Sequence, residues 1–205
     1  MRYNDVLTLI EMVGVLAFSM TGIFEARRLK MDIVGVYAVA MVTAFGGGSL
    51  RDIILDRHPL FWIEHYEYAV LLLLISIISL TIMKAMLTRK RTVILVLVLD
   101  ALGLGLFSSS GASIANQLGC APFVSALLGV ITGVFGGVMR DTICKEIPYV
   151  FQQRELYATC SFIGAWIYIL TVRITSQEIA AVIVCIVVTF SLRMLAIRYK
   201  IRLHI

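Results

Sequence analysis

Long apolar stretches, one after another, are the feature that most limits what this chain can fold into. About 20 apolar residues make a helix that crosses the hydrocarbon core of a bilayer, and such stretches follow one another from Val6 to Ile197. Hydrophobic residues are 60% of the 205, against about 45–50% in soluble domains. The sequence therefore predicts an all-α membrane protein. Its Lys and Arg form no basic face interleaved with aromatic residues, so we expect no nucleic-acid partner.

The apolar stretches predict seven transmembrane helices in a single integral membrane domain, 1–205. The expected ranges are Val6–Phe24, Ile33–Leu55, Tyr68–Met86, Thr92–Gly111, Pro122–Cys144, Leu156–Val172 and Ile179–Ile197. Of the 18 Lys and Arg, only Arg2, Arg51, Arg57 and Arg173 fall on the side of the N-terminus, and 14 fall on the other side. Because basic residues are enriched in cytoplasmic loops, we expect the N-terminus outside and the C-terminus in the cytoplasm.

The chain repeats itself at an offset of 89 residues. At this offset Thr43–Asp52 aligns with Thr132–Asp141, and Glu11 aligns with Asp100. We interpret this as a duplication, with repeat one at about 4–88, repeat two at about 93–176 and an unpaired last helix at about 178–198. Each repeat holds three helices, and three is odd. The repeats should therefore cross the membrane in opposite directions, an inverted repeat whose site lies near the midplane.

Glycines lie midway along the second and fifth expected helices. A triplet, Gly46-Gly47-Gly48, precedes Arg51-Asp52, and a pair, Gly136-Gly137, precedes Arg140-Asp141. Consecutive glycines permit a kink or an unwound turn, which a bilayer tolerates only beside protein or a water-filled cavity. The alternative is that the glycines let helices pack closely. Because the motif occurs twice at matching positions, we expect breaks in both helices.

Acidic residues lie on glycine-lined faces of the first and fourth expected helices. Glu11 shares its face with Gly14, and Asp100 shares its face with Gly103. Such an acid points into the bundle, where it attracts cations, pairs with Arg51 or Arg140, or is a protonated hydrogen-bonding group. Each Arg-Asp pair has two possible roles. It lines a water path, or its two residues form a salt bridge with each other as neighbours in the helix.

Motifs typical of an enzyme or of a bound cofactor are absent from the sequence. It holds no Ser-His-acid set, no H-E-x-x-H and no phosphate-binding G-x-x-x-x-G-K-[ST]. The four cysteines have no metal-ligand spacing, and we expect them to be packing residues. We therefore expect neither catalysis nor a cofactor.

The paired segments AFGGGSLRDIILDRHPLFWI and GVFGGVMRDTICKEIPYVFQ closely resemble the bacterial branch of the trimeric intracellular cation (TRIC) channel family, also described as a glycine-transporter-type membrane domain. The resemblance covers essentially the whole chain. It implies a homotrimer in the lipid of the bacterial inner membrane. Each subunit would hold its own pore for potassium or sodium ions between the two repeats, lined by glycine-kinked helices two and five.

The resemblance also implies a set of site residues. A transient monovalent cation is expected at Gly46, Gly47 and Gly136. The expected pore lining is Thr43, Phe45, Gly46, Gly47, Gly48, Ser49, Thr132, Phe135, Gly136 and Gly137. The charged residues expected at the pore or its gate are Glu11, Arg51, Asp52, Asp100, Arg140 and Asp141.

A carrier of glycine or another small amino acid would use the same parts differently. The carboxylate of the amino acid would bind at the half-helix N-termini that begin at Ser49 and Val138. Its ammonium group would bind at Glu11, Asp100 or the carbonyls of the kinks. An inverted repeat is compatible with a channel and with a carrier, so both functions remain open at this point.

Overall fold

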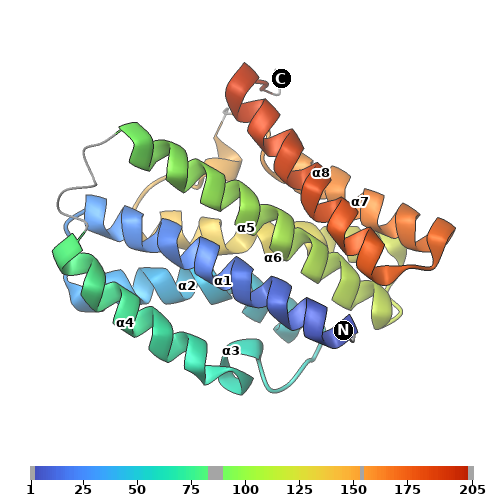
Figure 1. Ribbon diagram of the computed structural model, residues 1–205, viewed down its shortest axis with the longest axis horizontal. Helices are drawn as coiled ribbons and strands as arrows, with labels where there is room; N and C mark the ends of the chain where they lie inside the picture. Colours follow the sequence, from blue (N-terminus) through green and yellow to red (C-terminus); the bar gives the residue numbers. More distant parts are fainter. Residues whose placement is uncertain (1–2, 83–89, 153–154, 203–205) are drawn as a thin grey trace.

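The regular elements of the computed structural model, which describes residues 3–82, 90–152 and 155–202, are helices (Figure 1). These residues form eight α-helices and one short 3-10 helix. They are α1 (Tyr3–Arg28), α2 (Ile33–Ile54), α3 (Phe61–Glu64), α4 (Tyr66–Ile82), α5 (Lys90–Gln117), α6 (Pro122–Ile143), η2 (Tyr149–Phe151), α7 (Ala158–Thr175) and α8 (Glu178–Tyr199).

Six of these helices, α1, α2, α5, α6, α7 and α8, are long and apolar enough to cross a membrane. The chain is therefore a multi-pass membrane protein. The helix expected at Tyr68–Met86 corresponds to α4, a shorter apolar helix, and residues 83–86 lie outside the described part of the chain. Seven spans thus remain a prediction. Arg2, Lys84, Arg89 and Arg154 of the orientation count also lie outside the described residues.

Local sequence signals fix several helix ends. The Asp32 side chain accepts a hydrogen bond from the Gly35 backbone N–H at 2.8 Å, which caps the start of α2. Pro122 occupies the first turn of α6, where its missing N–H costs nothing. Gly119, with φ of 77°, reverses the chain after α5. The two short helices, α3 and η2, were not among the sequence-based expectations.

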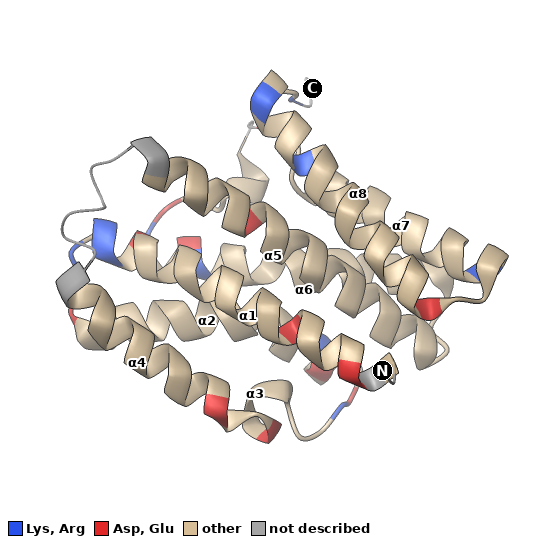
Figure 2. Ribbon diagram, in the orientation of Figure 1, with Lys and Arg blue, Asp and Glu red and all other residues tan. Residues whose placement is uncertain are grey.

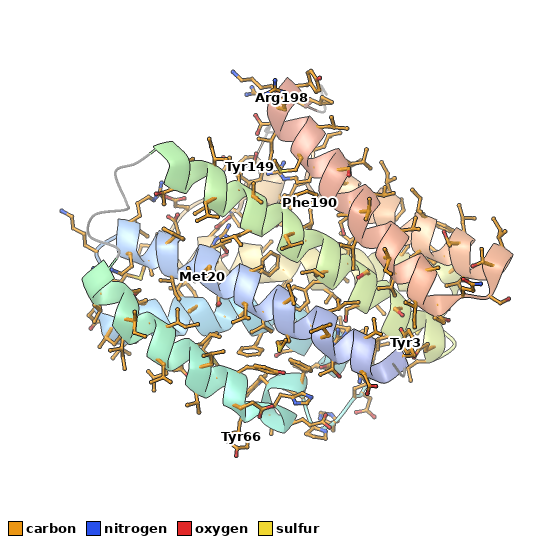
Figure 3. All side chains as sticks on the ribbon, viewed as in Figure 1. Tyr3, Met20, Tyr66, Tyr149, Phe190 and Arg198 are labelled. Carbon is orange, nitrogen blue, oxygen red and sulfur yellow. The ribbon has the colours of Figure 1, made fainter. Side chains whose placement is uncertain are left out.

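The centre of the bundle is formed by α1, α2, α5 and α6, which pack against one another (Figure 1). On one side, α4 packs against α2 and α1; on the other, α7 and α8 pack together and against α5. Many side chains project outward from the outer helices (Figure 3). Large apolar residues are among the exposed ones, including Leu74, Leu170 and Val187. Such exposure is expected where lipid, not water, surrounds the helices.

Glycines bring the central helices unusually close together. A Cβ atom placed on Gly47 would lie 2.1 Å from the Thr132 carbonyl oxygen, and one on Gly136 would lie 2.3 Å from the Thr43 carbonyl oxygen. The backbones of α2 and α6 therefore touch at two points that lie 89 residues apart in the sequence. Small residues commonly permit this approach in membranes.

The expected breaks at these glycines are not present in this structure. Helix α2 runs without interruption from Ile33 to Ile54, and α6 runs without interruption from Pro122 to Ile143. Close packing of α2 on α6, the alternative that the sequence left open, is what Gly47 and Gly136 provide. In continuous helices the backbone carbonyls bond within the helix, so no carbonyl is freed here by an unwound turn.

The glycine contacts predict a position-specific effect of alanine. Gly47→Ala and Gly136→Ala should each destabilise the protein by about 1–3 kcal/mol, because the methyl group would push α2 and α6 apart. Their neighbours are matched controls: a Cβ atom on Gly48 or Gly137 would approach no atom closer than 3.9 or 3.7 Å. Those two variants should keep or raise the melting temperature in detergent, since alanine favours a helix by about 1 kcal/mol over glycine. Equal losses at all four positions would contradict this account.

Candidate functional site

Arg51 of α2 lies at the centre of a buried ionic network. Its Nη1 donates to the Glu11 carboxylate of α1 at 2.6 Å and to the Ser110 hydroxyl of α5 at 2.9 Å. Its Nε donates to Asp52 at 2.8 Å, and Asp52 also pairs with Arg57 at 3.1 Å. The Arg51 side chain is 0% exposed. Three central helices are thus joined through one guanidinium, which satisfies charges that would be costly if unpaired in a membrane.

Arg140 of α6 forms the second network. Its Nε donates to Asp141 at 2.8 Å, its Nη1 donates to the Thr21 hydroxyl of α1 at 3.1 Å, and Nη1 lies 3.6 Å from Asp100 of α5. The second oxygen of Asp141 accepts a hydrogen bond from the Tyr149 backbone N–H at 2.9 Å. The Arg140 side chain is 14% exposed.

The two networks use matching positions. Glu11 and Asp100, Arg51 and Arg140, and Thr21 and Ser110 are each separated by 89 residues. Each arginine therefore binds an acid from its own half of the chain and a hydroxyl from the other half. Of the alternatives for Glu11 and Asp100, pairing with arginine is the arrangement in this structure. The Arg-Asp neighbours also form the expected salt bridges.

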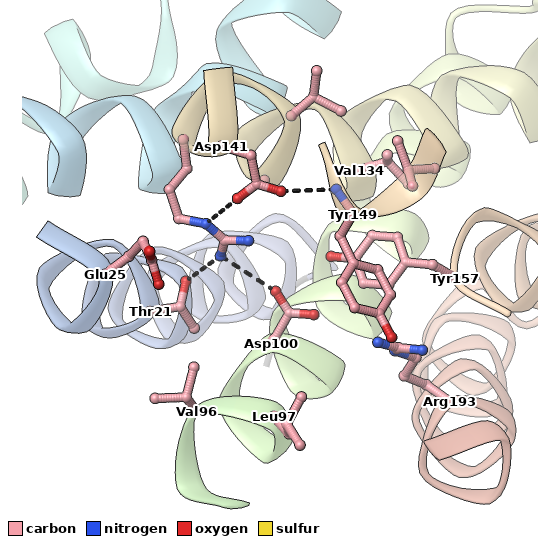
Figure 4. Close-up of a pocket in the computed structure, with 14 residues that line it drawn as sticks. Thr21, Glu25, Val96, Leu97, Asp100, Val134, Asp141, Tyr149, Tyr157 and Arg193 are labelled. Atoms are coloured by element: carbon pink, nitrogen blue, oxygen red, sulfur yellow. Dashed lines mark hydrogen bonds and ion pairs between the residues drawn. The ribbon is translucent and has the colours of Figure 1, made fainter. Parts of the chain in front are cut away.

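A cavity of about 100 Å³ adjoins the Arg140 network (Figure 4). Its charged lining comprises three carboxylates, from Glu25, Asp100 and Asp141, and two guanidiniums, from Arg140 and Arg193. Tyr149 and Tyr157 form part of the same wall (Figure 4). The formal charge of the lining is −1, because three negative groups face two positive ones.

A second polar cavity, of about 340 Å³, lies near the other end of α1 and is lined in part by Glu11, Arg57, Glu64 and His65. Charged residues thus gather toward both ends of the central helices (Figure 2). Glu11 and Glu25 lie 14 residues apart on α1, which corresponds to about 21 Å of helix.

Two phenylalanine rings fill the core between these cavities. The ring centroids of Phe18 on α1 and Phe107 on α5 are 5.2 Å apart, and both side chains are buried. Each ring packs over a glycine of the facing helix: a Cβ atom on Gly103 would lie 2.3 Å from Phe18, and one on Gly14 would lie 3.1 Å from Phe107. The glycines on the acid-bearing faces therefore make room for the aromatic pair.

The residues predicted to line the pore lie in three different places in the structure. Thr43, Gly47, Thr132 and Gly136 lie buried at the crossing of α2 and α6. Phe45, Gly46, Ser49 and Phe135 line an open, largely apolar groove of about 340 Å³ between α2 and α6. Gly48 faces a small cavity beside Arg51, and Gly137 lines the cavity beside Arg140.

Several residues of these surroundings were missed as site residues. Thr21 and Ser110 align at the same offset as the acids, so their shared hydroxyl was a usable signal. Phe18 and Phe107 also align, but an aromatic residue on an apolar face does not by itself indicate a place between two polar cavities. Arg193 is one of the 14 basic residues expected on the cytoplasmic side, but the structure buries it beside Tyr149 and Tyr157.

Known proteins with similar sequences identify the family to which this chain belongs. A sequence model of the family described as "Glycine transporter" matches residues 8–84 and 97–173. The chain belongs to the glycine transporter (TRIC) family. Among curated members, the UPF0126 inner membrane protein YadS of Escherichia coli (strain K12) is 33% identical over 195 residues, which is 95% of this chain and 93% of that protein. A UPF0126 membrane protein of Vibrio cholerae is 34% identical over 98% of this chain and 82% of that protein.

Solved structures of the family share the fold. The TRIC trimeric intracellular cation channel orthologue from Rhodobacter sphaeroides is 31% identical, with a TM-score of 0.87 over 95% of this chain and 98% of that one. A prokaryotic TRIC channel in 0.5 M KCl gives the same TM-score and identity over 96% of this chain and 98% of that one.

The burial of Arg51 predicts that its substitution destabilises the protein. Arg51→Gln should destabilise the protein by about 3–5 kcal/mol, because Glu11 would lose its guanidinium partner inside the bundle. Arg140→Gln should cost less, since the adjoining cavity leaves this side chain partly exposed. Arg57→Gln is the matched control: its side chain is 42% exposed, and an exposed pair contributes about 0–1 kcal/mol. Thermal unfolding in detergent compares the three, and equal losses for Arg51 and Arg57 would contradict the network's role.

Proposed function

We propose that this protein is a channel for monovalent cations such as potassium or sodium, with a pathway inside each subunit between the two halves of the chain. The similarity to TRIC cation channels over nearly the whole length of both chains is the observation that carries the proposal. The net negative lining of the cavity beside Arg140 supports it, because a low-dielectric cleft with an excess of one charge concentrates ions of the opposite charge.

The proposed pathway connects the two polar cavities. It leads from Asp100 past Phe18 and Phe107 to Glu11, along α1 and α5. The separation of 14 positions between Glu11 and Glu25 corresponds to about 21 Å of helix, which is most of the roughly 30 Å hydrocarbon core. The aromatic pair packs tightly between the cavities, so we infer that this structure represents a closed channel.

We propose an inverted repeat as the frame of this pathway, with seven spans that include α4. The two stretches that match the family model begin and end 89 residues apart, and the glycine contacts and arginine networks recur at the same offset. Reciprocal contacts of this kind are expected when two copies of one unit face each other in opposite directions.

Opening involves the crossing of α2 and α6. Phe18 lies 3.5 Å from the place of a Cβ atom on Gly136, so movement at this crossing changes the space around the ring. Glycines are common sites of helix bending. We infer that α2 and α6 bend at Gly47 and Gly136 when the channel opens, and that carbonyls freed at Gly46, Gly47 and Gly136 then bind the passing cation. Thr43 and Thr132 line the pathway at this level.

A glycine carrier is the second candidate, favoured by the description of the family and by the mixed charge of one cavity. Arg140 and Asp100 lie on the walls of a cavity of about 100 Å³, so the carboxylate and the ammonium group of a small amino acid each have a partner of opposite charge there. In this function the two cavities open alternately, and the aromatic pair separates them.

The proposed oligomeric state and cellular location are based on the related proteins. We propose a homotrimer, since the related channel from Rhodobacter sphaeroides is described as trimeric. We also propose the inner membrane of a bacterium, as for YadS, with the N-terminus outside and the C-terminus in the cytoplasm on the basis of the basic residues.

Flux in liposomes tests the function. Purified protein should pass potassium ions with a current that grows in proportion to voltage, and it should show no saturable counterflow of labelled glycine. Saturable glycine counterflow without ion current would replace the channel by the carrier. Native mass measurement of the same preparation tests the homotrimer, and a stable dimer would contradict it.

The aromatic pair predicts two variants with raised flux. Phe18→Ala and Phe107→Ala should each increase potassium flux per oligomer severalfold, because truncation removes the ring that fills the core between the cavities. Each should also lower stability, by about 3–5 kcal/mol for loss of a buried ring. Phe123→Ala is the control, since this phenylalanine is 55% exposed on α6. Unchanged flux in both variants, with an assembled protein, would place the pathway elsewhere.

A further inference from the structure

Arg193 of α8 stands apart from the other two buried arginines. Its side chain is 1% exposed, yet within the described residues no carboxylate lies within ion-pair distance of it, whereas Arg51 and Arg140 each pair with two. Its Nη1 donates to the backbone carbonyls of Leu156 at 2.9 Å and Glu155 at 3.3 Å. Its Nε has no hydrogen-bond partner in the described structure. Arg193 therefore forms no direct ion pair within the described residues, and the Glu155 carboxyl acts on its charge only from beyond ion-pair distance.

Two tyrosine rings hold this charge at the cavity wall. The guanidinium carbon lies 4.9 Å from the centre of the Tyr149 ring and 4.8 Å from that of Tyr157 (Figure 4). The negative faces of aromatic rings attract cations, and the attraction grows when water is excluded. The guanidinium thus occupies a position that would also attract a free cation.

The loop that carries these tyrosines is fastened without Arg193 as well. The Leu156 backbone N–H donates to the Ile201 carbonyl at 3.0 Å, and Arg202 pairs with Glu155 at 3.6 Å. The Tyr149 hydroxyl donates to Glu155, and this hydrogen bond lowers the pKa of that carboxyl below its ordinary value. Several contacts therefore hold residues 155–157 against the end of α8, so anchoring the loop does not by itself account for a buried, unpaired charge.

Arg193 contributes to the net charge of the cavity lining. Arg140 is compensated by Asp100 and Asp141, and Glu25 also pairs with Arg28, whose side chain is 57% exposed. Without Arg193 the formal charge of the lining would change from −1 to −2. Charges inside a protein are screened far less than charges in water. We propose that Arg193 is a tethered cation that limits the access of transported cations to this cavity. The proposal rests on the cation-channel function.

Neutral and charged substitutions test the proposal. Arg193→Gln and Arg193→Met should each raise potassium flux per oligomer roughly threefold to tenfold at low ionic strength, because the cavity attracts cations more strongly. They should also shift the reversal potential in a KCl gradient toward the value for ideal cation selectivity. Arg193→Lys keeps the charge and should stay near the wild type. The difference should shrink as salt screens the cavity mouth.

Arg198→Gln is the matched control. It removes the same charge from the same helix, but Arg198 is exposed near the end of α8 and does not line the cavity (Figure 3). Its flux and reversal potential should match those of the wild type. Native mass and melting temperature of every variant show whether the oligomer is intact.

The outcomes separate this proposal from the function on which it rests. If the wild type passes no cations, the channel itself is wrong. If the wild type conducts and Arg193→Gln and Arg193→Met behave like Arg198→Gln, the tethered cation is wrong and the channel stands. Failure of both neutral variants to assemble would make Arg193 a structural anchor and would also overturn the proposal.

Discussion

Pairing of buried arginines with buried acids is the interaction on which the centre of this bundle depends. A charged group at membrane depth is costly unless it is paired or hydrogen-bonded, and Arg51 meets this condition through Glu11, Asp52 and Ser110. Those partners lie on three different helices. The pairing therefore stabilises one relative position of α1, α2 and α5, and a displaced helix would leave a charge without its partner.

Glycines set how closely the same helices approach. Between helices in lipid there is little hydrophobic driving force, so contact area and hydrogen bonding decide their association. The backbone contact of Gly47 with Thr132 and of Gly136 with Thr43 brings α2 and α6 together in the middle of the bundle. The arginine networks then lie on either side of this contact along the helices. The α2–α6 contact and the two arginine networks together connect the central helices.

The sequence predicted the helices well and the geometry of their glycines poorly. Helix length in a bilayer is set by its thickness, so apolar length alone placed α2 and α6 within a residue of their ends. The effect of Gly46-Gly47-Gly48 depends on what faces it, because glycine permits both a break and a close contact. The facing residue, Thr132, is distant in sequence, and only the fold shows that its backbone needs that space.

The charged residues show the same limit. An offset of 89 residues aligned Glu11 with Asp100 and Arg51 with Arg140, which was enough to predict that they belong together. It also aligned Thr21 with Ser110, but it could not show which arginine each hydroxyl binds, since each lies in the opposite half from its arginine. Arg193 has no charged counterpart at this offset, where it aligns with Leu104, and its helix lies outside the two stretches that match the family model. The 89-residue alignment therefore could not reveal its place.

Departure from symmetry between the two halves has a physical consequence. The Arg51 side chain is fully enclosed, whereas the Arg140 side chain is 14% exposed to a cavity that also contains the tyrosine-bound Arg193. Residues that align at the 89-residue offset thus lie in different dielectric surroundings. In the proposed channel, a cation that approaches the Arg140 end would meet three carboxylates and two guanidiniums before it reached the aromatic pair. Helix α8, which lies outside the two stretches that match the family model, supplies one of those charges, and it therefore helps to give the two ends of the bundle different electrostatics.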